Sequence, residues 1–84
     1  MKIITTKRFD RSFKKLPKNI QKILGKQLKL LLSNFSHPSL KIKKVKSLDG
    51  ILEGRVNKSY RFLFSIMSEA YVLLDVGDHD KILK

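Results

Sequence analysis

Residues 60–76 read YRFLFSIMSEAYVLLDV, two mainly apolar runs separated by Ser68 and Glu69. Both runs are rich in aromatic and β-branched residues and have the length of a strand, and the polar pair between them is typical of a turn. Asn57-Lys58-Ser59 predicts another turn, before which residues 51–56 read as a shorter strand. The last third of the chain therefore predicts an antiparallel meander over residues 51–56, 60–67 and 70–76.

The two faces of this meander differ in character. Side chains alternate between the faces of a strand, so one face of the middle strand is predicted to pack onto helices through Tyr60, Phe62, Phe64 and Ile66. The same alternation predicts that the last strand points one way with Ala70, Val72, Leu74 and Val76. The other face carries Arg61, which places a guanidinium away from the predicted core.

That second face is half apolar, and no helix is left in the sequence to cover it. We therefore expect an exposed surface that binds a partner protein, formed by Leu63, Met67, Tyr71 and Leu73. Ile82 and Leu83 in the tail are close enough in sequence to cover part of it.

The first half of the chain predicts a short strand and two helices. Residues 2–5 read as the strand, and Thr5 or Thr6 is suited to cap the helix that follows. Pro17 lacks an N–H and suits a first helical position, so it should separate two helices rather than lie within one. From residue 18 to 35 an apolar stripe recurs at helical spacing, formed by Ile20, Ile23, Leu24, Leu28, Leu31 and Phe35.

The net charge of +12 is concentrated in the first half of the chain. Residues 1–48 carry 14 Lys and Arg against one acid, Asp10, whereas residues 49–84 carry 5 against 6. Such a field attracts nucleic acid, anionic lipid or an acidic protein without specifying which. A lysine-rich solvated surface is the alternative interpretation, so charge alone is weak evidence.

The densest positive run is KIKKVK, residues 41–46. It reads as a short strand or an extended arm. A solvated connector and an edge that contacts phosphates are equally good interpretations of its four lysines, Lys41, Lys43, Lys44 and Lys46.

Several classes of protein are disfavoured by what the sequence lacks. It has no cysteine, so it has neither a disulfide framework nor a thiolate metal site. It shows no phosphate-binding glycine loop, no zinc-ligand spacing, and no apolar run long enough for a signal peptide or a membrane span. We expect one cytoplasmic domain over residues 1–84, without a metal or cofactor.

The order of elements and the local sequence resemble the RelE/ParE superfamily of type II toxin–antitoxin toxins over nearly the whole chain. The motifs that carry the resemblance are Leu48-Asp49-Gly50, Gly54-Arg55-Val56, Tyr60-Arg61-Phe62-Leu63-Phe64 and Val76-Gly77-Asp78-His79-Asp80. The resemblance implies an α+β fold in which a small antiparallel sheet packs on an N-terminal pair of helices. It also implies a cognate antitoxin as partner, in a hetero-oligomer.

In the ribonuclease branch of that family, the resemblance implies metal-independent cleavage of messenger RNA, mostly on the ribosome. Arg61 matches the arginine that stabilises the phosphate, and His79 matches a catalytic histidine that can act as general acid or base. Arg55 and the four lysines of residues 41–46 would then bind the substrate. Two features depart from the family: Leu83 stands where a tyrosine is common, and the upstream glutamate used by some relatives has no counterpart in the lysine-rich region.

Other interpretations of the same residues stay open. Arg61 could simply pair with Glu53 or Asp75, and the acids around His79 could hold a surface imidazole or a weakly bound metal ion. At the level of function, the alternatives are a ParE-like inhibitor of DNA gyrase and a basic module that binds an antitoxin without catalysis.

Overall fold

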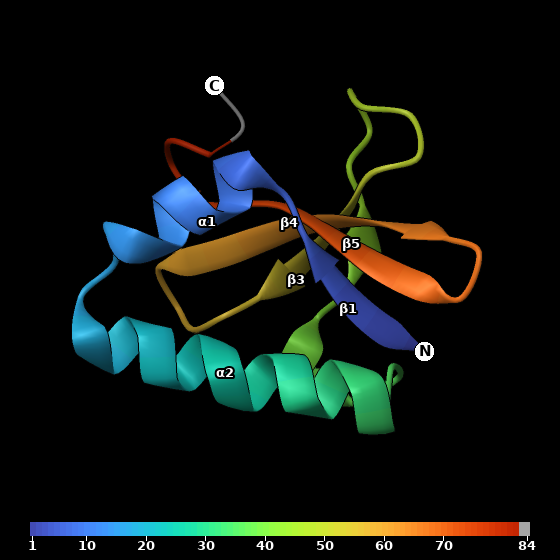
Figure 1. Cartoon of the computed structure of the whole chain (residues 1–84), viewed down its shortest axis with the longest axis horizontal. Helices are drawn as coiled ribbons and strands as arrows, with labels where there is room; N and C mark the ends of the chain where they lie inside the picture. The colour runs from blue at the N-terminus through green and yellow to red at the C-terminus, as the bar shows by residue number, and fades with distance from the viewer. Residues whose placement is uncertain (83–84) are drawn as a thin grey trace.

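The computed structural model describes residues 1–82. Two α-helices, a short 3-10 helix and five strands occur in this part of the chain. In chain order they are β1 (Lys2–Thr5), α1 (Lys7–Lys14), α2 (Lys18–Ser33), the 3-10 helix (Pro38–Leu40), β2 (Lys43–Lys44), β3 (Leu52–Arg55), β4 (Tyr60–Met67) and β5 (Ala70–Asp78) (Figure 1). The last strand is two residues longer than predicted, and the run 41–46 contributes only the two-residue strand β2.

All five strands form one sheet, in the order β1-β5-β4-β3-β2. The predicted meander is present as β3, β4 and β5, each antiparallel to the next. β1 pairs in parallel with β5 at one edge, and β2 pairs antiparallel with β3 at the other. The α+β fold is thus confirmed, and the parallel pairing of β1 makes the sheet mixed rather than wholly antiparallel.

The helix α2 runs along one face of the sheet, which we call the covered face (Figure 1). Its predicted apolar stripe supplies buried residues to the core, and Phe62, Phe64 and Leu73 of the sheet have no exposed surface at all. α2 ends at Ser33, before the predicted Phe35, whose ring instead stacks on Tyr71 with 5.9 Å between centroids. The core therefore lies between α2 and the covered face.

The helix α1 is tied to β5 by polar contacts at both of its ends. The Thr6 hydroxyl accepts a hydrogen bond from the Phe9 N–H and donates one to the Leu73 carbonyl of β5, so Thr6 rather than Thr5 is the cap. In the last turn of α1, the Ser12 hydroxyl donates to the Asp75 carboxylate at 2.6 Å. The chain then breaks before α2 at Pro17, as predicted.

A β-bulge decides which residues of β5 enter the core. Leu63 pairs with Asp75 and Phe64 with Leu73, so Leu74 has no partner on β4. An extra residue in one strand reverses the alternation beyond it. Tyr71 and Leu73 before the bulge and Val76 after it all belong to the core. The predicted shared face of Ala70, Val72, Leu74 and Val76 is therefore wrong.

Gly54 allows β3 to pass over the core without a side chain. It lies directly opposite Phe62 in the sheet, and a Cβ built at Gly54 would collide with the Phe62 ring. Phe62 thus occupies the space that a larger residue at position 54 would take.

Neither α1 nor α2 combines the length and apolarity needed to cross a membrane; the search covered residues 1–82.

Candidate active site

Two arginines face each other on the side of the sheet opposite α2, which we call the arginine face. Arg55 of β3 and Arg61 of β4 are directly paired in the register, and residues paired in this way project from the same face. Arg55 Nε donates to the Asn57 carbonyl at 3.2 Å, and Arg61 Nη1 donates to the same carbonyl at 2.6 Å. One backbone oxygen in the turn between the strands therefore holds both guanidinium groups.

The turn itself is fixed by the side chain of Asn57. Its Oδ1 accepts hydrogen bonds from the N–H groups of Ser59 and Tyr60, at 3.0 and 2.9 Å. Arg61 Nη1 also donates to the carbonyls of Lys58 and Tyr60, at 3.2 and 3.0 Å. The guanidinium of Arg61 is thereby bent back over the turn, toward the end of the sheet.

No carboxylate neutralises this pair of arginines within residues 1–82. The ion pairs found there are Arg8 with Asp75, Lys43 with Glu53, and His79 with Asp80. The expected alternative, in which Arg61 pairs with Glu53 or Asp75, is therefore wrong. Like charges directly opposite each other destabilise a sheet, so a bound anion would relieve an unfavourable contact as well as form new bonds.

His79 follows β5 and is tied to the same turn. Its backbone N–H donates to the Ser59 carbonyl at 2.9 Å, next to the carbonyls that bind Arg61. Its imidazole is 49% exposed, with Nε2 3.3 Å from Asp80 Oδ1. Gly77 of β5 pairs with Arg61 of β4 and lies two residues before His79. A Cβ built at Gly77 would have no other atom within 4 Å. This leaves open space beside the guanidinium.

Arg55 and Arg61 on the arginine face, and the backbone of His79, thus all contact the turn at residues 57–59. A guanidinium donates in a fork that matches two phosphate oxygens, and an imidazole transfers protons near neutral pH. These are the side-chain types that a site handling a phosphodiester requires.

The four lysines of residues 41–46 do not share one face. Lys43 pairs with Glu53 and lies on the arginine face, whereas Lys44 pairs with Leu52 and lies on the other side of the sheet. Lys41 precedes β2 in a left-handed conformation, with φ at 44°. Lys46 lies in the loop that follows β2. Of the two lysines in β2, the structure therefore brings Lys43 to the side of the arginines.

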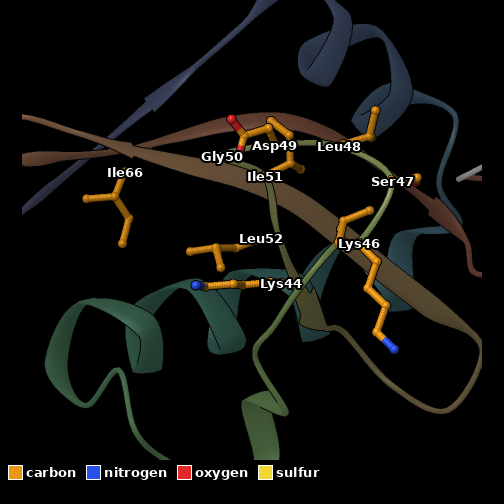
Figure 2. A pocket seen from close by; sticks show the side chains of 10 residues that line it. Lys44, Lys46, Ser47, Leu48, Asp49, Gly50, Ile51, Leu52 and Ile66 are labelled. Atoms are coloured by element: carbon orange, nitrogen blue, oxygen red, sulfur yellow. The ribbon is translucent and has the colours of Figure 1, made fainter.

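A cavity of about 680 Å³ lies beneath the loop between β2 and β3 (Figure 2). Lys44, Leu52 and Ile66 project toward the same space, while Lys46 extends on the other side of the loop (Figure 2). The loop turns at Gly50, whose φ of 76° is readily adopted only without a side chain.

The predicted partner-binding surface is divided by the bulge in β5. Tyr71 is 6% exposed and Leu73 is wholly buried in the core, so the prediction that they lie on an exposed face is wrong. Met67, at the end of β4, is 62% exposed. Leu63 is on the arginine face but buried, and it borders a cavity of about 340 Å³ together with Ile82. Leu83 lies outside the described residues.

Asp78, His79 and Asp80 form the one group in the described chain with the spacing of metal ligands. Their ligand atoms lie within 4.8 Å of one another, and His79 and Asp80 are exposed. The Asp78 carboxylate already accepts the Asp80 N–H at 2.8 Å, as in an ordinary Asx turn. Turn formation accounts for this cluster.

Two residues contribute to the site in ways that the sequence analysis does not predict. The side chain of Asn57 caps the backbone of the turn, and an Asn at a turn is the signal for such capping. Glu53 is predicted as a possible partner of Arg61, and it is instead buried beside Lys43.

Comparison with known proteins gives a fold and no sequence family. Neither a protein-family model nor a curated protein matches the chain. Solved structures do match. YafQ from E. coli superposes with a TM-score of 0.82 at 15% identity, over 98% of this chain and 97% of YafQ.

Two further structures extend the comparison to other organisms. RelE in the RelB–RelE antitoxin–toxin complex from Methanococcus jannaschii gives a TM-score of 0.77 at 20% identity, over 95% of this chain and 94% of that one. A YoeB/ParE toxin from Agrobacterium tumefaciens gives a TM-score of 0.78 at 12% identity, over 94% of this chain and 99% of that one. This chain has the RelE/ParE-like toxin fold. YafQ, too, has been solved in complex with an antitoxin, DinJ.

Proposed function

We propose that this protein is the toxin of a type II toxin–antitoxin pair, and that it inhibits translation by cleaving messenger RNA at the site formed by Arg55, Arg61 and His79. The observation that supports this most strongly is the arginine pair, which lies face to face without a carboxylate partner in the described chain. The fold supports it as well, since matching structures are toxins solved with antitoxins.

The proposed reaction uses the 2′-hydroxyl of the RNA as nucleophile. The 2′ oxygen bonds to the adjacent phosphorus while its proton passes to a base, the bond from phosphorus to the 5′ oxygen breaks, and that oxygen takes up a proton. The products carry a 2′,3′-cyclic phosphate and a 5′-hydroxyl. This chemistry needs charge stabilisation and proton transfer, which side chains supply without a metal.

Each residue has a role that follows from its position. Arg61 and Arg55 would bind the non-bridging oxygens, whose charge grows in the transition state, through the guanidinium nitrogens not held by the turn. His79, exposed and anchored to the same turn, would protonate the leaving 5′ oxygen. An antitoxin would neutralise the toxin by covering the arginine face and excluding RNA.

Induced expression in a bacterial host tests the proposal. Wild type should arrest growth and create new RNA 5′ ends inside translated messages, and Arg61→Ala combined with His79→Ala should do neither. The matched control is Arg11→Ala, which removes one positive charge from the exposed surface of α1 and should arrest growth like wild type.

The other outcomes separate the competing functions. Growth arrest without new RNA ends would overturn the ribonuclease and indicate a ParE-like action on gyrase. Normal growth at good soluble expression would overturn the toxin and favour a basic module that binds a partner without toxicity.

A further inference from the structure

The sheet register distinguishes the two lysines of β2 from each other. Lys43 pairs directly with Glu53 of β3, and Arg55 follows Glu53 by two residues on the same face. Its neighbour Lys44 pairs with Leu52, which packs against the core on the other face. The two lysines of β2 are therefore both exposed and equally charged, but they face opposite sides of the sheet.

Glu53 is the one buried charged residue in the described chain. Its side chain is 9% exposed, and its only ionic partner there is Lys43, with Nζ 3.6 Å from Oε2. Burying a carboxylate is costly unless a positive group compensates, so the position of Lys43 is coupled to that of Glu53. The Lys43 side chain remains 73% exposed, so its ammonium contacts the Glu53 carboxylate on one side and solvent on the other.

The spacing relates this pair to the arginines. Adjacent strands lie about 4.8 Å apart and alternate residues of a strand lie about 7 Å apart, so Lys43 on β2 is roughly 10 Å across the sheet from β4. Arg61 moreover bends back toward the turn, away from Lys43. Lys43 is therefore too distant to share a phosphate with Arg61, and it is placed to meet a neighbouring one.

We infer that Lys43 and Glu53 form a second phosphate subsite on the arginine face, in which Lys43 binds a flanking phosphodiester of the same single-stranded RNA and Glu53 is the residue that positions it. This inference rests on the proposed function. It separates the two lysines of β2 into an oriented phosphate contact, Lys43, and a lysine on the other face of the sheet, Lys44.

The first test compares Lys43→Ala with its matched control Lys44→Ala. Binding of a 2′-O-methyl RNA oligonucleotide, which cannot be cleaved, is measured over a series of salt concentrations. Lys43→Ala should weaken binding about 5- to 10-fold and reduce the slope of log affinity against log salt by about 0.7, as expected for one lost phosphate contact on a single strand. Lys44→Ala should change affinity less than about twofold. Equal losses in the two variants would overturn the subsite.

The second test asks whether Glu53 acts through Lys43. Glu53→Gln alone is uninformative, because losing a negative charge favours RNA while losing the anchor disfavours it. A double-mutant cycle separates these effects. In the Glu53→Gln background, Lys43→Ala should cost less than about twofold, because the ammonium has lost the ionic partner that fixes its position on the arginine face. An undiminished cost would show that Glu53 does not position Lys43.

Thermal unfolding of each variant checks that folded proteins are compared. If Glu53→Gln is unstable, Glu53→Asp replaces it; this variant keeps the negative charge and should retain part of the effect of Lys43→Ala on RNA binding. Failure of the inference is distinguishable from failure of the proposed function. If wild type binds and cleaves RNA while Lys43→Ala behaves like Lys44→Ala, only the subsite is overturned. If wild type neither binds nor cleaves RNA, both are overturned.

Discussion

The covered face of the sheet packs Phe62, Phe64 and Leu73 against α2, whereas the arginine face sets Arg55 opposite Arg61 with no carboxylate to neutralise either within the described chain. The first arrangement is favourable in the isolated protein, since burial of apolar surface stabilises the fold. The second is unfavourable until an anion binds. Under the proposed function, stability resides in one face and ligand binding in the other, so substitutions on the two faces should affect different measurements.

The largest effect expected is on the covered face. Phe62→Ala removes a fully buried ring and leaves a cavity above Gly54, so it should lower the free energy of unfolding by about 3–5 kcal/mol, measured by urea denaturation. Met67→Ala on the exposed end of β4 is the control and should change it by less than about 0.5 kcal/mol. Similar losses in the two variants would contradict the assignment of the core.

Arg61→Ala should separate activity from stability. Removing a group that stabilises developing charge typically lowers the rate about 10²- to 10³-fold, and we expect that loss for cleavage of a message in a translating extract. The free energy of unfolding should change by about 1 kcal/mol or less, because Arg61 bonds only to carbonyls in a solvent-accessible turn. If Arg61→Ala lost cleavage activity because the protein unfolded, the claim that the arginine face serves activity and not stability would be contradicted.

The bulge in β5 is tested by two adjacent leucines. Leu73→Ala should cost about 2–5 kcal/mol, because Leu73 is fully buried on the covered face. Leu74→Ala should cost only about 1 kcal/mol, because Leu74 is the residue of the bulge and is only partly buried. The reverse order would restore the simple alternation predicted from the sequence.

The smallest expected effect concerns the attachment of α1. Thr6→Ala removes the helix cap and the bond to the Leu73 carbonyl, and should lower the free energy of unfolding by about 1 kcal/mol. Thr5→Ala, in an exposed position of β1, should have a smaller effect. Equal effects of the two substitutions would contradict the assignment of Thr6 as the cap of α1.

The elements of the fold could be predicted because each carries a strong local signal. Pro17 separates the helices, an apolar stripe marks α2, and polar turns delimit β4 and β5. The bulge could not be predicted, because YVLLDV alternates equally well in either phase and the choice depends on pairing with β4. One residue of slippage moved Tyr71 and Leu73 from a predicted binding surface into the core.

The candidate site was only partly readable in the sequence. Arg61 and His79 could be singled out by resemblance, and the structure brings both to the turn at residues 57–59. The facing of Lys43 and Lys44 could not be predicted, because a two-residue strand has no periodicity from which to assign faces. Whether Glu53 pairs with Arg61 or with Lys43 depends on tertiary contacts that no local pattern encodes.

The most direct test of the arginine face as an RNA-cleaving site is the chemistry of the ends it leaves. Message incubated with wild-type protein in a translating extract is mapped with and without a kinase that phosphorylates 5′-hydroxyl ends. We expect new 5′ ends that are captured only after kinase treatment, and a 2′,3′-cyclic phosphate at the 3′ end of each upstream fragment. These ends should be absent with Arg61→Ala and present with Arg11→Ala. New ends bearing a 5′-phosphate, or the same ends with Arg61→Ala, would contradict the arginine face as an RNA-cleaving site.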